Sequence, residues 1–175
     1  MWIAISGSWR VTNAEVESDV RRVVQEIIQK GDGIVTGGAL NVDSFALDEA
    51  LKHDLGARQI RVFLPTTLKI YADHYRKRAR EGVITEQQAE DLINQLFELK
   101  NINPRALIEN MENTEVNKES YFQRNSEVVR NSNELIVFQV NNSAGAQDAV
   151  DKAKEMNVPV KIFSYTIDNL KTRET

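Results

Sequence analysis

Three short glycine-containing turns in this sequence combine residue types suited to binding an anion. They occupy residues 6–8 (SGS), 36–38 (TGG) and 143–145 (SAG), and each follows an apolar run and precedes a helix-like segment. Glycine has no Cβ to obstruct a ligand, and a helix N-terminus offers free N–H groups and the positive end of its dipole. The alternative, that the glycines only shape tight strand–helix connections, stays open. The turns predict phosphate or ribose contacts from Gly7, Ser8, Gly37, Gly38, Ser143, Gly145 and Gln147.

An arginine–asparagine pair lies on the helix expected before the apolar run 135–140. Tyr121, Asn125 and Val128 share one face of this helix, and Arg124 lies beside it. An unsatisfied guanidinium or amide next to a packed face is costly, so both side chains need partners. Either a nearby carbonyl or carboxylate supplies them, or a bound nucleotide does. Arginine presents a planar fork to phosphate, and asparagine can bind a base edge.

Two aspartates stand at the starts of the helices that follow the second and third turns. Asp43 and Asp148 each fit the role of a first-turn carboxylate that favours the helix dipole. A carboxylate beside a phosphate is unhelpful unless it faces sugar hydroxyls, so the functional alternative for both is contact with a ribose. Asp148 is also the candidate catalytic carboxylate if the protein hydrolyses a nucleotide.

Alternating apolar runs and helical stripes place these side chains on an α/β fold. Strands are predicted at 2–5, 34–35, 60–64, 135–140 and 158–163. Parallel strands joined by helices imply a sheet covered on both faces, with ligands at its carboxyl edge. For the first helix, Thr12 and Glu15 predict a capping box, and an apolar stripe follows at Val16, Val20, Val23, Val24, Ile27 and Ile28.

The segment 66–116 interrupts this alternation. Thr85 and Gln88 fit a capping box, and a helical apolar stripe follows at Ala89, Leu92, Ile93, Leu96 and Phe97. We therefore expect a helical insertion of two or more helices rather than another strand–helix unit. The predicted fold is a Rossmann-like three-layer sandwich with a central parallel sheet, forming one domain over residues 1–175.

The composition limits the chemistry that remains. The chain has no cysteine and two histidines, so thiolate nucleophiles and Cys-based metal sites are excluded and a multi-histidine site is disfavoured. We expect no metal and no cofactor. No apolar run approaches membrane-spanning length and no signal peptide is recognisable, so we expect a cytoplasmic protein without a membrane partner. The net charge of −4 disfavours general coating of nucleic acid but leaves room for a local basic patch.

A basic stretch inside the predicted insertion is such a patch. Basic side chains interleaved with tyrosine suit single-stranded DNA, through phosphate pairing and base stacking. An acidic stretch follows at 81–98, so the alternative is a solvated helix whose charges pair locally. The residues concerned are Tyr71, Tyr75, Arg76, Lys77, Arg78 and Arg80.

Three blocks together resemble the SLOG superfamily of Rossmann-like nucleotide-binding domains, namely residues 4–10 (AISGSWR), 33–51 and 121–149. Within it, the DprA/Smf branch is the most similar. Its R-N pair corresponds to Arg124-Asn125, and its S-G turn resembles residues 143–145 with one residue inserted. Its pattern (T/S)G-x-A-x-x-x-D corresponds to Thr36, Gly37, Ala39 and Asp43. The resemblance implies a nucleotide or nucleotide-derived ligand, with single-stranded DNA as the DprA-like alternative. We also expect a homo-oligomer.

Two further branches sharpen the alternatives. The LOG branch, similar to cytokinin-activating phosphoribohydrolases, has P-G-G-x-G-T-x-x-E after the fourth strand. Here Ala149 stands at the glutamate position, with Asp148 one position earlier, which disfavours hydrolysis of an N-glycosidic bond. YspA/YpsA-like relatives begin with S-G-S-R-x-x-T, which residues 6–10 resemble with Trp9 inserted before Arg10. A binding module, a DNA-binding protein and a hydrolase remain as hypotheses.

Overall fold

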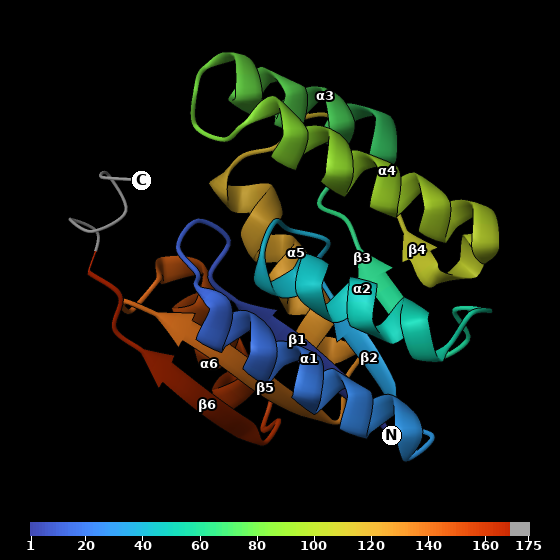
Figure 1. Ribbon diagram of the computed structural model, residues 1–175, viewed down its shortest axis with the longest axis vertical. Helices are drawn as coiled ribbons and strands as arrows, with labels where there is room; N and C mark the ends of the chain where they lie inside the picture. Colours follow the sequence, from blue (N-terminus) through green and yellow to red (C-terminus); the bar gives the residue numbers. More distant parts are fainter. Residues whose placement is uncertain (169–175) are drawn as a thin grey trace.

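Six parallel strands form a single sheet in the computed structural model, which describes residues 1–168. Their order across the sheet is β4-β3-β2-β1-β5-β6 (Figure 1). The five strands predicted from the sequence are confirmed, and all neighbouring strands pair in parallel. The bounds are Trp2–Gly7 (β1), Gly33–Thr36 (β2), Ile60–Phe63 (β3), Leu107–Ile108 (β4), Glu134–Val140 (β5) and Val160–Tyr165 (β6).

The strand order creates a switch point beside β1. From β1 the chain moves outward through β2, β3 and β4, and then returns to place β5 against the other side of β1. Ala4 of β1 is therefore in register with both Val35 of β2 and Leu135 of β5. Helices that leave the carboxyl ends of β1 and β5 go to opposite faces of the sheet, which opens a crevice between them. The fold itself thus favours a binding site at this point.

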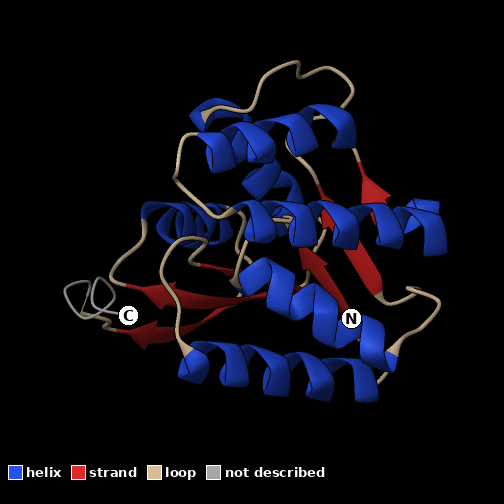
Figure 2. Ribbon diagram, turned by 45° about the horizontal axis from the view of Figure 1, so that its top comes forward, coloured by secondary structure: helices blue, strands red, loops and turns tan. Residues whose placement is uncertain are grey.

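Helices cover both faces of the sheet, which confirms the predicted three layers (Figure 1 and Figure 2). α1 (Ala14–Gln29) and α2 (Val42–His53) pack over a core that includes Ile5 and Phe138. α5 (Lys118–Arg130) and α6 (Ala144–Glu155) cover the other face, over Val35 and Val137. None of the helices in residues 1–168 combines the length and hydrophobicity needed to cross a membrane.

The N-cap of the first helix lies one residue later than predicted. The apolar stripe of α1 is buried as predicted. The capping box expected from Thr12 and Glu15 is wrong, because Asn13 is the N-cap and its side chain accepts a hydrogen bond from the Val16 N–H at 3.0 Å. Asparagine and threonine both favour this position, so the choice between neighbours depends on the path of the preceding loop.

The segment after β3 contains the predicted helices and one strand that was not predicted. α3 (Leu68–Arg80) and α4 (Glu86–Ile102) pack together, and Thr85 forms the predicted capping box at the start of α4. A short 3-10 turn (η1, Pro104–Ala106) then leads into β4, which pairs with β3 at the edge of the sheet. The segment is therefore also a strand-to-strand crossover. Two strand residues are too short a run for an apolar pattern to reveal.

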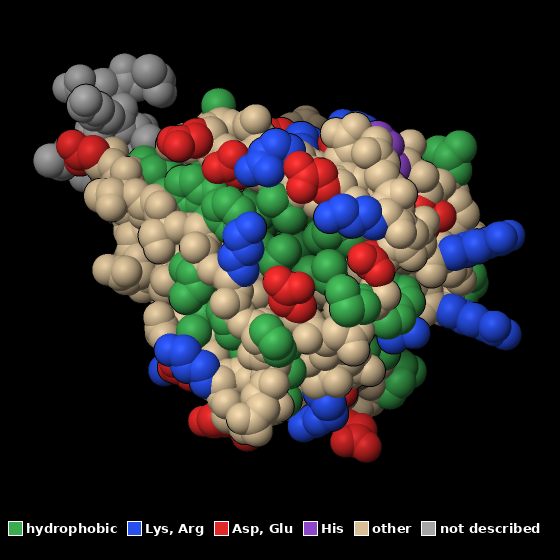
Figure 3. Space-filling view, turned by 90° about the horizontal axis from the view of Figure 1, so that it is seen from below, with side chains coloured by type: hydrophobic (Ala, Val, Ile, Leu, Met, Phe, Trp, Pro, Cys, Tyr) green, Lys and Arg blue, Asp and Glu red, His purple; other side chains and the backbone are tan. Residues whose placement is uncertain are grey.

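The opposite edge of the sheet is formed by β6. Within residues 1–168 its outer side has no partner strand, and Ile162 of this strand is 46% exposed. On the face shown in Figure 3, hydrophobic side chains gather near the middle and are surrounded by charged side chains of both signs. An exposed edge strand offers unpaired N–H and C=O groups to another chain.

Candidate functional site

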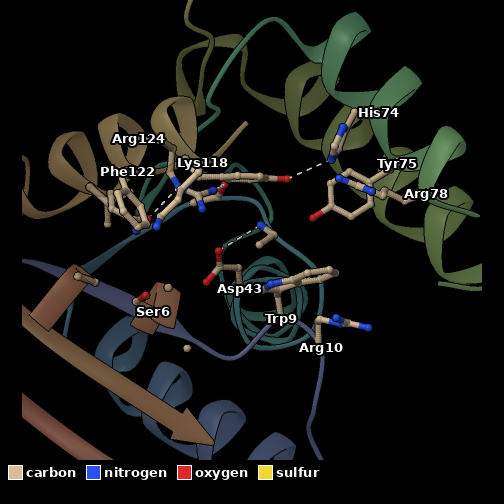
Figure 4. A pocket seen from close by; sticks show the side chains of 18 of the residues that line it. Ser6, Trp9, Arg10, Asp43, His74, Tyr75, Arg78, Lys118, Phe122 and Arg124 are labelled. Atoms are coloured by element: carbon tan, nitrogen blue, oxygen red, sulfur yellow. Dashed lines mark hydrogen bonds between the residues drawn. The ribbon is translucent and has the colours of Figure 1, made fainter. Parts of the chain in front are cut away.

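A pocket of about 480 Å³ opens at the carboxyl edge of the sheet, at the switch point between β1 and β5. Its walls come from the end of β1, the turn after β2, the α3–α4 hairpin, one face of α5 and the first turns of α6. Figure 4 shows Trp9 and Arg10 on one side, facing residues of α3 and α5 on the other. The pocket therefore collects side chains from segments far apart in the sequence.

The three predicted turns converge on this pocket. Gly7, Gly37 and Gly145 all line it, and Arg124 and Asn125 reach it from α5. Of the other predicted residues, Asp43 lines the pocket, whereas Ser8, Gly38, Ser143 and Gln147 do not. The geometric convergence is thus confirmed, and ligand binding by these residues stays a prediction.

The turn after β2 is filled by the side chain of Arg124. Its Nη1 donates a hydrogen bond to the Gly37 carbonyl, and its Nε donates to Asn125 Oδ1 at 3.1 Å. A Cβ at Gly37 would lie 2.5 Å from the guanidinium, so the absence of a side chain makes room for the arginine. Arg124 is only 8% exposed. The protein itself therefore supplies hydrogen-bond partners for Arg124. This agrees with the alternative in which a nearby carbonyl, and not a bound nucleotide, satisfies the guanidinium.

Gly38 faces the core and not the pocket. Its φ of +67° is a left-handed conformation that favours glycine. An added Cβ would lie 2.8 Å from Leu64 and 3.0 Å from Val62, while the Gly38 carbonyl accepts a hydrogen bond from Tyr71 Oη at 3.0 Å. The expectation that Gly38 leaves room for a ligand is therefore wrong, because its missing side chain makes room for core residues instead.

Asp43 occupies the anion position of the same turn. Its Oδ2 accepts a hydrogen bond from the Ala39 N–H at 3.1 Å, and the residue is 6% exposed. Burial raises the pKa of Asp43, while the Arg124 guanidinium and the Ala39 N–H act in the opposite direction. This N–H, which would bind a phosphate in the predicted site, already has a carboxylate partner.

Asn125 connects α5 to α6 through Asp148. Asn125 Nδ2 donates to Asp148 Oδ2 at 2.9 Å, and Lys152 Nζ lies 2.6 Å from Asp148 Oδ1. Asp148 does not line the pocket, whereas Ala149 does. Both oxygens of the candidate catalytic carboxylate therefore have partners within the protein.

The third predicted turn, residues 143–145, runs into the first turn of α6 and has more open space. A Cβ at Gly145 would have no heavy atom within 4 Å, and the buried Ser143 Oγ has no hydrogen-bond partner within the described residues. Gln147 donates a hydrogen bond to Asp151 of the same helix and accepts one from Gln139 of β5. Ser8 accepts from the Val11 N–H and so holds the loop after β1. Ser8 and Gln147 therefore have local structural partners.

Cationic and aromatic side chains that the sequence analysis did not assign complete the walls. Lys118, Tyr121 and Phe122 of α5 line the pocket, as do Trp9 and Arg10 of the loop after β1. On α5 the signal was available, because residues 118, 121, 122 and 125 recur at helical spacing on the face of Asn125. On the loop no periodicity exists to reveal which side chains turn inward.

Most cations in the basic stretch of α3 form ion pairs with nearby acidic side chains, as the alternative of local charge pairing predicted. Arg76 pairs with Glu90 of α4 at 2.9 Å, and Arg78 pairs with Glu81 at 3.0 Å. Lys77 approaches Glu81 at 3.8 Å. Tyr71 and Tyr75 are buried, so neither presents a ring on the outer surface of α3, and base stacking by Tyr75 stays a prediction. Of the stretch, Tyr75 and Arg78 line the pocket, while Arg76, Lys77 and Arg80 do not.

His74 adds a titratable group to the α3 wall. Its Nε2 lies 3.5 Å from Tyr121 Oη. Burial, with Arg78 and Lys77 nearby, lowers the pKa of His74, whereas burial raises the pKa of Tyr121. The lowered pKa favours the neutral form of the His74 ring. Across residues 1–168 no group of three His, Cys, Asp or Glu side chains is arranged to hold a metal ion.

Comparison with known proteins places this geometry in a family. The family model described as DNA recombination-mediator protein A matches residues 1–174. No protein of curated function matches the chain.

Solved structures with the same fold include two DNA processing A proteins. DNA processing protein A from Helicobacter pylori, described for its single-stranded DNA binding mode, has a TM-score of 0.68 and 20% identity over 93% of this chain. DNA processing protein A (DprA) from Streptococcus pneumoniae has a TM-score of 0.50 and 15% identity over 91%. This chain covers 64% and 57% of those two chains. From its match to the family model, the chain belongs to the DNA recombination-mediator protein A family, the DprA/Smf branch that its motifs resemble.

Proposed function

We propose that the protein binds a nucleotide in the pocket at the switch point. The observation that carries the proposal is a pair of cations without carboxylate partners: within residues 1–168, neither Arg10 nor Lys118 forms an ion pair, and both line the pocket. The positive charge of each cation instead lies against an aromatic ring, Arg10 against Trp9 at 5.4 Å and Lys118 against Phe122 at 5.3 Å. Such charges attract an anionic ligand.

The aromatic walls favour a ligand with a base. Phe122 and Tyr121 come from α5, and Trp9, on the loop after β1, lies opposite Phe122 (Figure 4). Bases stack on aromatic side chains whatever their sequence, since every base has a π-face. A phosphate and a base in one ligand would use both features of the pocket.

The phosphate is expected at the turn before α6. The turn after β2 holds its own carboxylate, Asp43, whereas the first N–H groups of α6 have no partner inside the helix and border the pocket at Gly145. A helix N-terminus with free N–H groups favours an anion.

Binding of single-stranded DNA is the second candidate function, with one nucleotide of the strand in the pocket. Membership of the DNA recombination-mediator protein A family favours it, as does the single-stranded DNA binding described for the Helicobacter pylori protein. Arg80, which is exposed and has no ion pair within the described residues, lies two residues after Arg78 at the end of α3 and would add a further cation at this end of the helix.

Titration calorimetry with AMP and with a short oligo(dT) tests both candidates. Binding of AMP supports the free-nucleotide function, and binding of the oligonucleotide alone supports the DNA function. Lys118→Ala should weaken binding about tenfold, since a charge-assisted hydrogen bond is lost. Lys154→Ala, an exposed lysine of α6 outside the pocket, is the matched control and should leave affinity unchanged. A parent protein that binds neither probe contradicts the proposal.

A homo-oligomer in the cytoplasm belongs to the same proposal. The exposed edge strand β6 is compatible with association of copies of this chain. Light scattering of the purified protein measures its mass in solution, and a mass of one chain at all concentrations contradicts the oligomer.

A further inference from the structure

We propose that Trp9 is the residue on which the nucleobase stacks, so that the pocket selects ligands that carry a base. This inference rests on the proposed nucleotide-binding function and assigns one residue within it. Trp9 is 38% exposed although it is one of the largest side chains at the pocket. In Figure 4 its ring borders the cavity from the side opposite to Arg124, Phe122 and Lys118.

The loop that carries Trp9 is anchored to the sheet. Ser8 N–H donates to the Phe138 carbonyl of β5 at 3.2 Å, and the Ser8 carbonyl accepts from the Val42 N–H at the start of α2 at 3.4 Å. The Val11 N–H donates to Ser8 Oγ at 3.3 Å. A ring on an anchored loop loses little freedom when a base stacks on it, which is the condition for a strong contact.

Asn41 holds the backbone of Trp9 directly. Its Nδ2 donates to the Trp9 carbonyl at 2.6 Å. Asn41 is the N-cap residue of α2, but its side chain makes no capping hydrogen bond, and its φ is +65°. The amide is thus committed to the Trp9 loop and not to its own helix. Asn41 is therefore a positioning residue for Trp9.

The charges around Trp9 fit the ends of a nucleotide. The Arg10 guanidinium lies 5.4 Å from the Trp9 ring, and Lys118 and Arg78 line the opposite wall. A base stacked on Trp9 would place its own phosphate within the field of these cations. The other tryptophan, Trp2, lies outside the pocket and packs against Arg61, whose guanidinium carbon is 3.8 Å from the ring centre.

The two tryptophans allow a direct optical test. Trp2→Phe leaves Trp9 as the sole tryptophan, and its emission, excited at a wavelength that tyrosine does not absorb, should be quenched by AMP or by oligo(dT). Ribose 5-phosphate and an abasic oligonucleotide, which lack a base, should not quench it. The converse protein, Trp9→Ala, keeps Trp2 and should show no ligand-dependent quenching.

The Trp9 and Asn41 variants should also differ in their affinity for the base-bearing probes. Trp9→Ala should bind the base-bearing probes roughly 10- to 100-fold more weakly, the loss expected for one stacked base. Trp9→Tyr should recover most of this loss because it restores an aromatic ring. Asn41→Gly accepts the same φ without the amide, and it should weaken binding while the melting temperature stays near that of the parent. A merely structural role for Asn41 would lower the melting temperature and leave affinity unchanged.

Two failures are distinguishable. A parent protein that binds AMP or oligo(dT) while Trp9→Ala binds them equally tightly overturns the role of Trp9 and leaves the proposed function intact. A parent protein that binds neither probe overturns both.

Discussion

The turn at Gly37 and the turn at Gly145 border the same pocket, yet one is filled by the protein and the other is open. At the first turn, the Arg124 guanidinium occupies the space of a Cβ, and Asp43 accepts the Ala39 N–H. At the second, no atom lies within 4 Å of a Cβ built on Gly145. Both follow a strand; the Gly37 turn precedes α2, and the Gly145 turn forms the start of α6.

The difference indicates that a glycine turn at a helix N-terminus is open to an anion only when its N–H groups lack an acceptor within the protein. Asp43 is the acceptor at the first turn, and Arg124 balances its charge. The first turn therefore stabilises the fold, and the second is available to a ligand. The following predictions test this division, from the largest expected effect to the smallest.

Removing the Arg124 charge should have the largest effect. Arg124→Met leaves Asp43 buried without its nearby cation and the Gly37 carbonyl without its donor, at a cost of about 3 kcal/mol in the free energy of unfolding. Lys118→Met removes an exposed cation from the same helix and should change stability little. Chemical denaturation measures both, and equal stabilities would show that Arg124 belongs to the ligand site alone.

The stability difference between the parent and Arg124→Met should also change with pH in a defined direction. The pKa of Asp43 is raised by burial, so its contribution to stability is fully present below the unfolded pKa of about 3.9 and is lost as the pH rises through the folded pKa. Without Arg124 that loss should grow. The stability gap between parent and variant should therefore widen from acid to neutral pH, and Asp43→Asn in the variant should narrow it. A gap independent of pH would contradict the coupling.

Gly38→Ala should destabilise the protein without a specific effect on binding. The left-handed φ and the contacts with Leu64 and Val62 together cost about 3 kcal/mol. Gly31→Ala is the matched control, because Gly31 also has a positive φ but no atom within 4 Å of the added Cβ. It should cost about 1 kcal/mol. Thermal unfolding measures the stability of both variants. Equal losses of stability would contradict the role of the contacts with Leu64 and Val62.

Gly145→Val should weaken nucleotide binding while leaving the stability of the protein nearly unchanged. The added side chain meets no protein atom, so the free energy of unfolding should change little, while affinity for the nucleotide should fall about tenfold, or about 1.4 kcal/mol. Gly56→Val, in a loop outside the pocket, serves as the control for binding. Unchanged affinity for Gly145→Val in calorimetry would mean that the open turn does not contact the ligand.

The smallest expected effect is on hydrolysis of the N-glycosidic bond of a nucleotide. Asp148 is bonded to Asn125 and Lys152, and Ala149 stands where the LOG-like glutamate would lie. We therefore expect no release of free base from nucleoside monophosphates after long incubation with excess protein. Free adenine detected by chromatography, and lost in Asp148→Asn, would make the protein a hydrolase.

The fold could be predicted from the sequence because its signals are periodic. The buried stripe of α1 and the runs that form β1 and β5 repeat over enough residues to be recognised. β4 was missed because it has two residues, and the cap of α1 moved from Thr12 to Asn13 because neighbouring polar residues compete for the position.

The sequence predicts where the site lies along the backbone, but not which side chains fill or line it. Strand ends and glycine turns fix where the pocket lies, and these are local features. Whether a turn is filled depends on contacts such as that between Arg124 and Gly37, which lie 87 residues apart in the chain. Trp9 and Lys118 reach the pocket from different elements, so their association exists only in three dimensions.

A crystal structure of the protein soaked with AMP tests the central claim most directly. The account predicts the phosphate at the Gly145 turn, at the N-terminus of α6, and the base beside Trp9, while Asp43 keeps its hydrogen bond to the Ala39 N–H. A phosphate bound at Gly37 in place of Asp43, or a pocket without nucleotide when AMP binds elsewhere on the surface, would contradict it.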